Sequence, residues 1–263
     1  ATDSTTPVRR AFAALALAAS LLTLVVIAAS AFIRHTQAGL SCSDWPACYA
    51  AIEANARAAT GVSIARVLHR LAATGALVLV VGIWLSARAR GPAFGRVRVL
   101  ALAALLVAVA LGVLGIATPS AAIRAVALGN LMGGFGMLAL LAALLAAAID
   151  IAPPQAERAG ASSHSRLALA LLALALAQAA IGGLIGSGFA LTACTEVVRC
   201  IGFGIARTTV GGALDPFQPL VVAGGHVVGP AGAMALHIIH RALAIAVALG
   251  ALAFACALRS IDR

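Results

Sequence analysis

The sequence predicts an all-α integral membrane protein with about six transmembrane helices, and three observations support this fold class. The chain is 63% hydrophobic and only 10% charged, whereas a soluble domain carries roughly 25% charged residues. Its mean hydropathy is +1.08. Six apolar runs approach or exceed the roughly 20 residues that cross a bilayer, and they lack the period-2 alternation of barrel strands.

The six expected spans follow one another through the whole chain. They are approximately Ala11–Ile33, Val67–Ala87, Val99–Ala117, Ala125–Ile149, Leu167–Ile185 and Ala233–Leu258. The first run is too long for the apolar core of a signal peptide, which has about 7–15 residues, so we interpret it as a true span. Glycines such as Gly112, Gly115, Gly182 and Gly183 allow helices to approach closely. Because the sequence does not begin with Met, we expect that the chain was processed or that its start is missing.

Arginine carries the whole positive charge, because the net charge is +10 and the sequence contains no lysine. The arginines lie in short loops between apolar runs, which indicates topological anchoring and not nucleic-acid binding. The loop Arg88–Arg98 holds four arginines, so we expect it, and both termini, in the cytoplasm. The segments Arg34–Arg66, Thr118–Arg124 and Ser187–Gly232 then lie outside a bacterial-type plasma membrane.

Two cysteine pairs share one spacing. Cys42 and Cys48 lie in the first long outer segment, and Cys194 and Cys200 lie in the second. Because the outer compartment is oxidising, we expect the disulfides Cys42–Cys48 and Cys194–Cys200. A zinc site built from these four thiols is the alternative, although this spacing is unusual for zinc. Cys256 lies inside the last span, where a small buried apolar residue is expected.

Two His-Arg pairs follow the cysteine segments, at His69-Arg70 and His240-Arg241. Each pair stands at the opening of an apolar run. The chain therefore reads as two repeats: residues 1–150 with four helices, and residues 151–263 with two helices and a long outer loop. Internal repeats are common in membrane proteins and place sites at the repeat interface. Either the second half has lost two helices or the sequence is truncated.

Ligation of heme iron is one role that suits these histidines. Iron takes axial imidazole readily, an apolar bundle can enclose a flat macrocycle, and the adjacent arginine can pair with a heme propionate. The alternative is a histidine hydrogen-bonded to a neighbouring helix, beside an arginine that extends to the headgroups. Repetition of the pair favours His69 and His240 as iron ligands. His237, one turn before His240, is a second ligand, a propionate contact or an interfacial histidine.

At these residues the chain resembles the heme A synthase family. The segment Arg34–Cys48 reads Arg-His-Thr-Gln-Ala-Gly-Leu-Ser-Cys-Ser-Asp-Trp-Pro-Ala-Cys and is similar to that family's cysteine signature. The His-Arg pairs and the run Gln178–Ile185 are also similar to its motifs. The resemblance implies a pseudo-symmetric bundle of eight helices with four axial histidines and outer disulfides. It also implies oxidation of a methyl group of heme O to the formyl group of heme A.

The chain departs from the family pattern at three places. No histidine stands between Leu71 and Ser163, and Asn130 is near the position where the family has one. Arg66 stands where an acidic residue normally precedes the first His-Arg pair. Glu53 is the only glutamate of that outer loop, which makes it a weak catalytic candidate. The seventh and eighth helices are absent from the sequence.

These observations lead to two functional hypotheses. The first is a heme A synthase-like oxidoreductase that binds heme b, with heme O and heme A as further candidates, for terminal oxidase assembly. The second is a catalytically degenerate family member that serves as a heme b-binding electron-transfer or structural subunit of a respiratory complex. We expect membrane lipid, a respiratory or oxidase-assembly partner, or a second copy of the chain as partners. A transporter is disfavoured because the spans lack interior acids.

Overall fold

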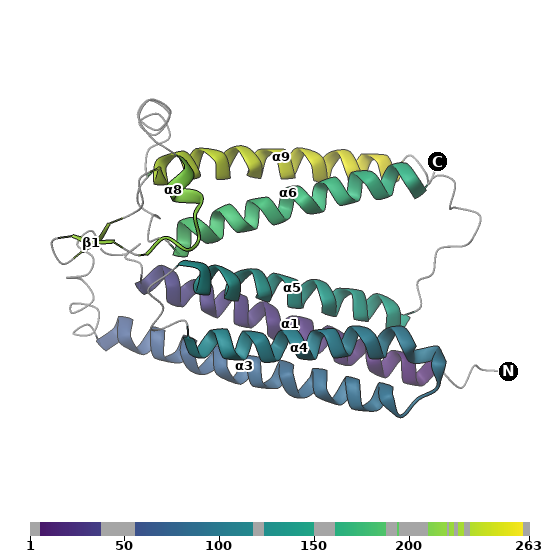
Figure 1. Ribbon diagram of the computed structural model, residues 1–263. Helices are drawn as coiled ribbons and strands as arrows, with labels where there is room; N and C mark the ends of the chain where they lie inside the picture. The colour runs from purple at the N-terminus through teal and green to yellow at the C-terminus, as the bar shows by residue number, and fades with distance from the viewer. Residues whose placement is uncertain are drawn as a thin grey trace. The chain divides into compact units, whose positions relative to one another are not determined.

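The computed structural model describes residues 6–37, 56–117, 124–149, 161–187, 194, 210–219, 221–223, 226–228 and 232–259. Within these ranges the chain is almost entirely helical (Figure 1). The long helices are α1 (Thr6–Gln37), α3 (Ala56–Arg88), α4 (Gly95–Ala117), α5 (Arg124–Ile149), α6 (Ala161–Ser187) and α9 (Ala233–Arg259). Each contains a stretch long and apolar enough to cross a membrane. The predicted all-α integral membrane fold is confirmed.

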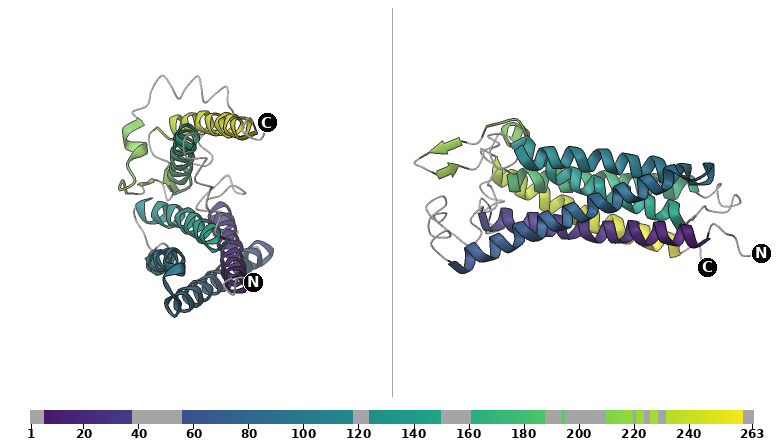
Figure 2. Two further views of the ribbon diagram at one scale, coloured as in Figure 1. Left: turned by 90° about the vertical axis from the view of Figure 1, so that its right-hand side faces the viewer. Right: turned by 90° about the horizontal axis from the view of Figure 1, so that it is seen from below.

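The chain forms two compact units. The first comprises Ala1–Ala121 and Gly129–Ile151, and the second comprises Ala122–Leu128 and Ala152–Arg263. In the first unit α1 lies along α3, and α3 packs against α4 (Figure 2). In the second unit α6 packs against α9. These units are defined by packing alone, so the proposed sequence repeat stays a prediction.

Small residues form much of the core of the first unit. Ala16, Ala19, Ala101 and Ala104 have no exposed surface, which lets the helix backbones approach closely. Larger side chains fill the remaining space, and those with less than 2% exposure in this unit are Val80, Ile83, Leu141 and Leu144. This core holds four helices around a common interior.

The arginine-rich connection between α3 and α4 contains the short 3-10 helix η1 (Pro92–Phe94). The rings of Phe12 and Phe94 lie 5.5 Å apart, centroid to centroid. The Arg90 guanidinium lies 5.8 Å and 5.9 Å from these two rings, a distance at which cation–π attraction acts. This connection thus closes one end of the first unit.

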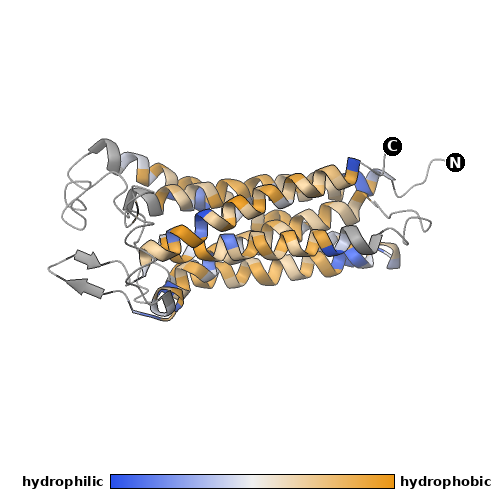
Figure 3. Cartoon of the chain, turned by 90° about the horizontal axis from the view of Figure 1, so that it is seen from above, coloured by the Kyte–Doolittle hydropathy of each residue, from blue (hydrophilic) through white to orange (hydrophobic). Residues whose placement is uncertain are grey.

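Long apolar side chains cover the outer faces of the helices. Ile116, Leu71, Ile64 and Ile245 are 62–83% exposed, as expected for surfaces that contact lipid tails. Figure 3 shows hydrophobic residues along the middle of the helices and hydrophilic residues concentrated toward helix ends. Membrane lipid is therefore the immediate environment of this chain.

The structure changes two expectations about the connections. α3 begins at Ala56, so His69 lies more than three turns inside the helix and not at its opening. Alanine-rich sequence extends α3 beyond the apolar run, because alanine is the strongest helix former. The second outer segment also holds α8 (Val210–Leu214) and an antiparallel hairpin of β1 (Val221–Ala223) and β2 (His226–Val228).

Gly232 introduces α9. Its φ of 89° lies in the left-handed region, which glycine adopts without the penalty that a Cβ would bring. The Leu236 amide donates to the Gly232 carbonyl oxygen at 3.1 Å, so the first helical hydrogen bond starts there. His240 then lies about two turns inside α9.

Candidate functional site

His69 lies on the inward face of α3. Val62, Ala65, Ala72 and Ala76 are buried, and their spacing of three, four and seven residues marks one helical stripe. His69 falls on this stripe, four residues after Ala65 and three before Ala72. It is half-buried, whereas the next residue, Arg70, is exposed.

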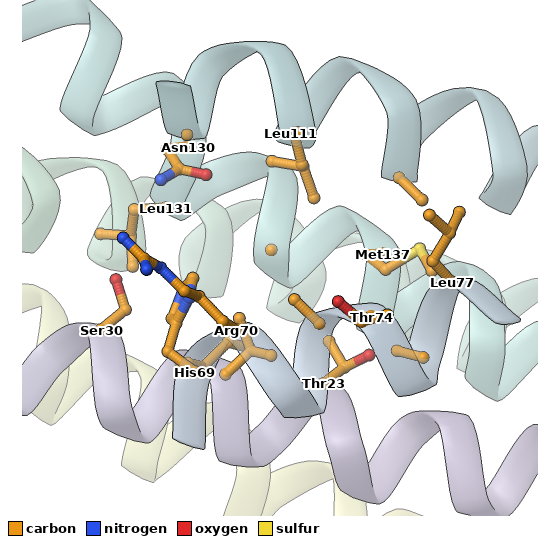
Figure 4. A pocket seen from close by; sticks show the side chains of 18 of the residues that line it. Thr23, Ser30, His69, Arg70, Thr74, Leu77, Leu111, Asn130, Leu131 and Met137 are labelled. Atoms are coloured by element: carbon orange, nitrogen blue, oxygen red, sulfur yellow. The ribbon is translucent and has the colours of Figure 1, made fainter. Parts of the chain in front are cut away.

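A cavity of about 630 Å³ lies beside His69 and is bounded by α1, α3, α4 and α5 (Figure 4). Its polar lining residues are Thr23, Ser30, His69, Arg70, Thr74 and Asn130. The other walls are aliphatic or glycine, apart from the thioether of Met137. Cofactor pockets are typically concave, mostly apolar, and about 300–1,000 Å³ in volume. The cavity has the size and character of such a pocket.

Asn130 contributes to the same cavity from α5. It begins an inward stripe that continues through Gly134, Met137 and Leu141 at helical spacing. Figure 4 shows its amide directed into the cavity, at the end where His69 and Arg70 project from α3. Sequence comparison with the family pattern pointed to Asn130, and the structure brings it together with His69.

His240 has different surroundings in the second unit. Its Nε2 lies 3.3 Å from Gln178 Nε2 on α6, so the neutral ring accepts this hydrogen bond from the amide. A Cβ placed on Gly182 would come within 2.8 Å of the His240 Cε1. The missing side chain of Gly182 therefore makes room for the imidazole. Gln178 and Gly182, four residues apart, share one face of α6.

The hydrogen bonding of this pair is incomplete. His240 Nδ1 and Gln178 Oε1 are buried without a hydrogen-bond partner among the described residues. A buried polar atom without a partner costs about 1–3 kcal/mol. His240 Nδ1 and Gln178 Oε1 are therefore available to form hydrogen bonds with a bound group if either side chain rotates.

Arg241 links α9 to the cysteine segment. It donates from Nη2 to the Cys194 carbonyl oxygen at 3.0 Å and approaches Cys194 Sγ at 3.5 Å. Cys194 is disulfide-bonded, and its partner lies outside the described residues. His237, one turn before His240, is half-buried. Cys256 is a free thiol on the exposed surface of α9, so the expectation of a buried residue was wrong.

The role of Arg124 was not predicted from the sequence, in which it stands as one more loop arginine. Arg124 is only 2% exposed. Its guanidinium donates to the carbonyl oxygens of Ala213, Gly212 and Asp215 and to Gln218 Oε1, at 2.7–3.1 Å. The partners lie about ninety residues away in sequence, so no local pattern could have revealed them. Arg124 thereby holds α8 within the second unit.

Several predicted site residues lie outside the described part of the chain. They are Cys42, Cys48, Glu53 and Cys200. The disulfide pairings, the zinc alternative and the catalytic role of Glu53 therefore stay predictions. Among the described residues, no group of three or more His, Cys, Asp or Glu side chains comes together.

The residues around the first cavity fit a heme group. An imidazole stands on one wall, a guanidinium lies next to it, and the remaining surface is largely aliphatic. Imidazole is a preferred ligand of iron, and guanidinium matches carboxylate geometry. In the second unit His240 and Arg241 repeat this combination, with Gln178 already bonded to the imidazole.

The fold and these residues define a polytopic helical membrane protein with histidines presented inside its helix bundles. Comparison with known proteins identifies a specific relative. The chain is 28% identical over 245 residues to a heme A synthase of Shewanella oneidensis, covering 86% of this chain and 72% of the relative. The chain is thus similar, at modest identity, to a heme A synthase. No family model and no solved structure matches it.

Proposed function

We propose that the first cavity binds heme through His69, with Arg70 beside it as the partner of a propionate. The observation that carries the proposal is the cavity of about 630 Å³ in which this histidine lies between aliphatic walls. The inward stripe of α3 orients His69 toward the cavity. Arg70 is exposed, so it can reach a carboxylate at the edge of the cavity.

We propose His240 as a second heme ligand, with Arg241 in the corresponding role and His237 as a propionate contact. Gln178 would release the imidazole when heme binds, and the free amide could then bond to another polar group. Arg241 already holds the Cys194 carbonyl, so part of its donor capacity would remain for the outer segment. Disulfides Cys42–Cys48 and Cys194–Cys200 would fix the two outer segments.

The activity supported by the similarity is oxidation of a methyl group of heme O to the formyl group of heme A. Heme supplies redox chemistry at iron, and the chain supplies orientation and an apolar enclosure. When water supplies the oxygen atom, conversion of the methyl group to a formyl group releases electrons and protons, so an external electron acceptor is required. Glu53 is the acidic candidate for this reaction. The proposed topology places both termini in the cytoplasm and the cysteine segments outside.

A second function follows from two particular residues. Arg66 is an exposed cation on α3 one turn before Arg70, and it cannot stabilise a developing positive charge as a carboxylate can. Asn130 supplies an amide where a second imidazole would complete the first site. These features favour a heme b-binding electron-transfer or structural subunit of a respiratory complex as the alternative.

Spectroscopy of purified variants tests heme ligation. The full chain is produced with heme available, and the absorbance and extracted heme of wild type, His69→Ala, His240→Ala and the double variant are compared. We expect each single variant to lose one population of heme and the double variant to lose nearly all. His164→Ala is the control, since this histidine lies at the start of α6 and is expected to face solvent. Unchanged heme content in the double variant contradicts the proposal.

Chromatography of the extracted heme separates the two functions. The chain is expressed in cells that make heme O but lack other heme A-forming activity. Appearance of heme A supports the oxidoreductase, and its loss in Glu53→Gln supports an acidic role for that residue. Bound heme b without heme A supports the subunit.

A further inference from the structure

We propose that Asn130 keeps one face of a heme in the first cavity open to a small neutral diatomic ligand, which its amide N–H would hydrogen-bond. The inference rests on the proposed binding of heme by His69. It concerns what stands on the opposite side of the cavity. The ligand class is that of carbon monoxide, nitric oxide and dioxygen.

The cavity offers few groups that could complete the coordination of iron. Among its lining residues within the described chain, His69 carries the one imidazole and Met137 the one thioether. Imidazole suits iron well, whereas amide oxygens suit harder cations. Once His69 occupies one face, Met137 is therefore the competitor that must be considered for the other.

Position along α5 distinguishes Asn130 from Met137. The two residues are seven positions apart, which is about 10 Å along a helix axis. Figure 4 shows Asn130, His69 and Arg70 toward one end of the cavity and Met137 with Leu77 toward the other. Asn130 thus lies across from the imidazole, and Met137 does not.

The chemistry of the amide suits a bound neutral ligand. Asn carries two N–H donors and one carbonyl acceptor. The neighbouring lining combines Ile27, Leu131 and Gly134 with the polar Ser30 and Arg70, so the amide is one of a few groups at this end that could donate to a bound ligand. Asn130 would act as a positioning residue for the ligand and not as an iron ligand.

The test uses the full chain carrying His240→Ala, so that heme at the first cavity is observed alone. Ferrous heme is titrated with carbon monoxide, and absorbance, spin state and the C–O stretching frequency are recorded. We expect high-spin, five-coordinate heme that binds carbon monoxide. Asn130→His should give low-spin heme, because the new imidazole can bind the open side of the iron. The affinity for carbon monoxide should fall at least about tenfold, since only the fraction of heme without this second imidazole can bind the gas.

Two more variants isolate the amide. Asn130→Leu should keep five-coordinate heme but raise the C–O stretching frequency, because the N–H donor is gone. Asn130→Gln should restore the lower frequency at least partly. Equal frequencies in wild type and Asn130→Leu overturn the proposed hydrogen bond.

Low-spin heme in the chain that retains Asn130 contradicts the proposed open coordination face, although heme binding by His69 would still stand. Met137→Leu then tests whether its thioether is the ligand that closes this face. Absence of any heme that depends on His69 contradicts the proposed function itself. The two failures therefore give different spectra.

Discussion

His69 and His240 share a sequence signature but lie in contrasting surroundings. His69 borders a cavity of about 630 Å³, whereas His240 is packed against Gly182 and bonded to Gln178. Around His69, four long helices contribute walls. Around His240, the described walls come from α6 and α9, with α8 nearby. Enclosing a cavity requires walls on several sides, whereas two helices alone close on each other.

The difference shows that the His-Arg motif identifies a candidate side chain but does not determine its contacts or the space around it. In the second unit the imidazole fills space that Gly182 leaves open, and its polar atom finds an amide. Such a contact satisfies the alternative considered from sequence, a histidine hydrogen-bonded to a neighbouring helix. Heme binding at His240 must therefore displace the contact with Gln178 in space that is already filled, whereas His69 borders an existing cavity. We expect the first site to load more readily.

Arg124→Met should have the largest effect on this contrast, because it removes the support of α8. The change leaves several carbonyl oxygens without donors, each at a cost of about 1–3 kcal/mol. Ala213 of α8 packs in the same cluster as Leu236, one turn before His240. We therefore expect unfolding in detergent to require at least about 3 kcal/mol less, with loss of His240-dependent heme only. Arg66→Met, at an exposed arginine, is the control and should change stability by less than about 0.5 kcal/mol.

Gly182→Ala should have an intermediate effect by forcing His240 out of its place. The added methyl would stand within 2.8 Å of Cε1, and such overpacking costs about 1–3 kcal/mol. Gly186→Ala is a matched control one turn further along α6, because a Cβ at that residue would meet nothing within 4 Å. Thermal unfolding of both variants measures the difference. Equal midpoints would show that His240 is not held against Gly182.

Gln178→Leu should have the smallest effect, and only heme binding at His240 should respond to it. Removing the partner costs about 0.6 kcal/mol, the average of hydrogen bonds between transmembrane helices. The same energy no longer opposes heme at His240, so heme affinity there should rise by roughly threefold. Heme at His69 should be unaffected. Heme titration in His69→Ala and His240→Ala backgrounds separates these sites, and equal changes at both would contradict the contrast.

Much of the fold could be predicted because a membrane-spanning helix is marked by the hydropathy of consecutive residues. The runs Ala125–Ile149 and Ala233–Leu258 match α5 and α9 to within a residue at each end. The start of α3 was placed too late, because hydropathy marks the apolar stretch and alanine propensity extends the helix beyond it. The inward orientation of His69 also follows from spacing alone, since small apolar residues precede and follow it at helical intervals.

The chain sequence was sufficient for the number of spans, their order, and the histidines and arginines available for chemistry, because each depends on local composition. Only the tertiary structure decided that His69 borders a cavity and that His240 packs against Gly182. It also decided that Arg124 is a buried anchor and that Asn130 lies across from His69. These outcomes depend on side chains that come together from helices far apart in the chain, where packing and not local sequence determines what space remains.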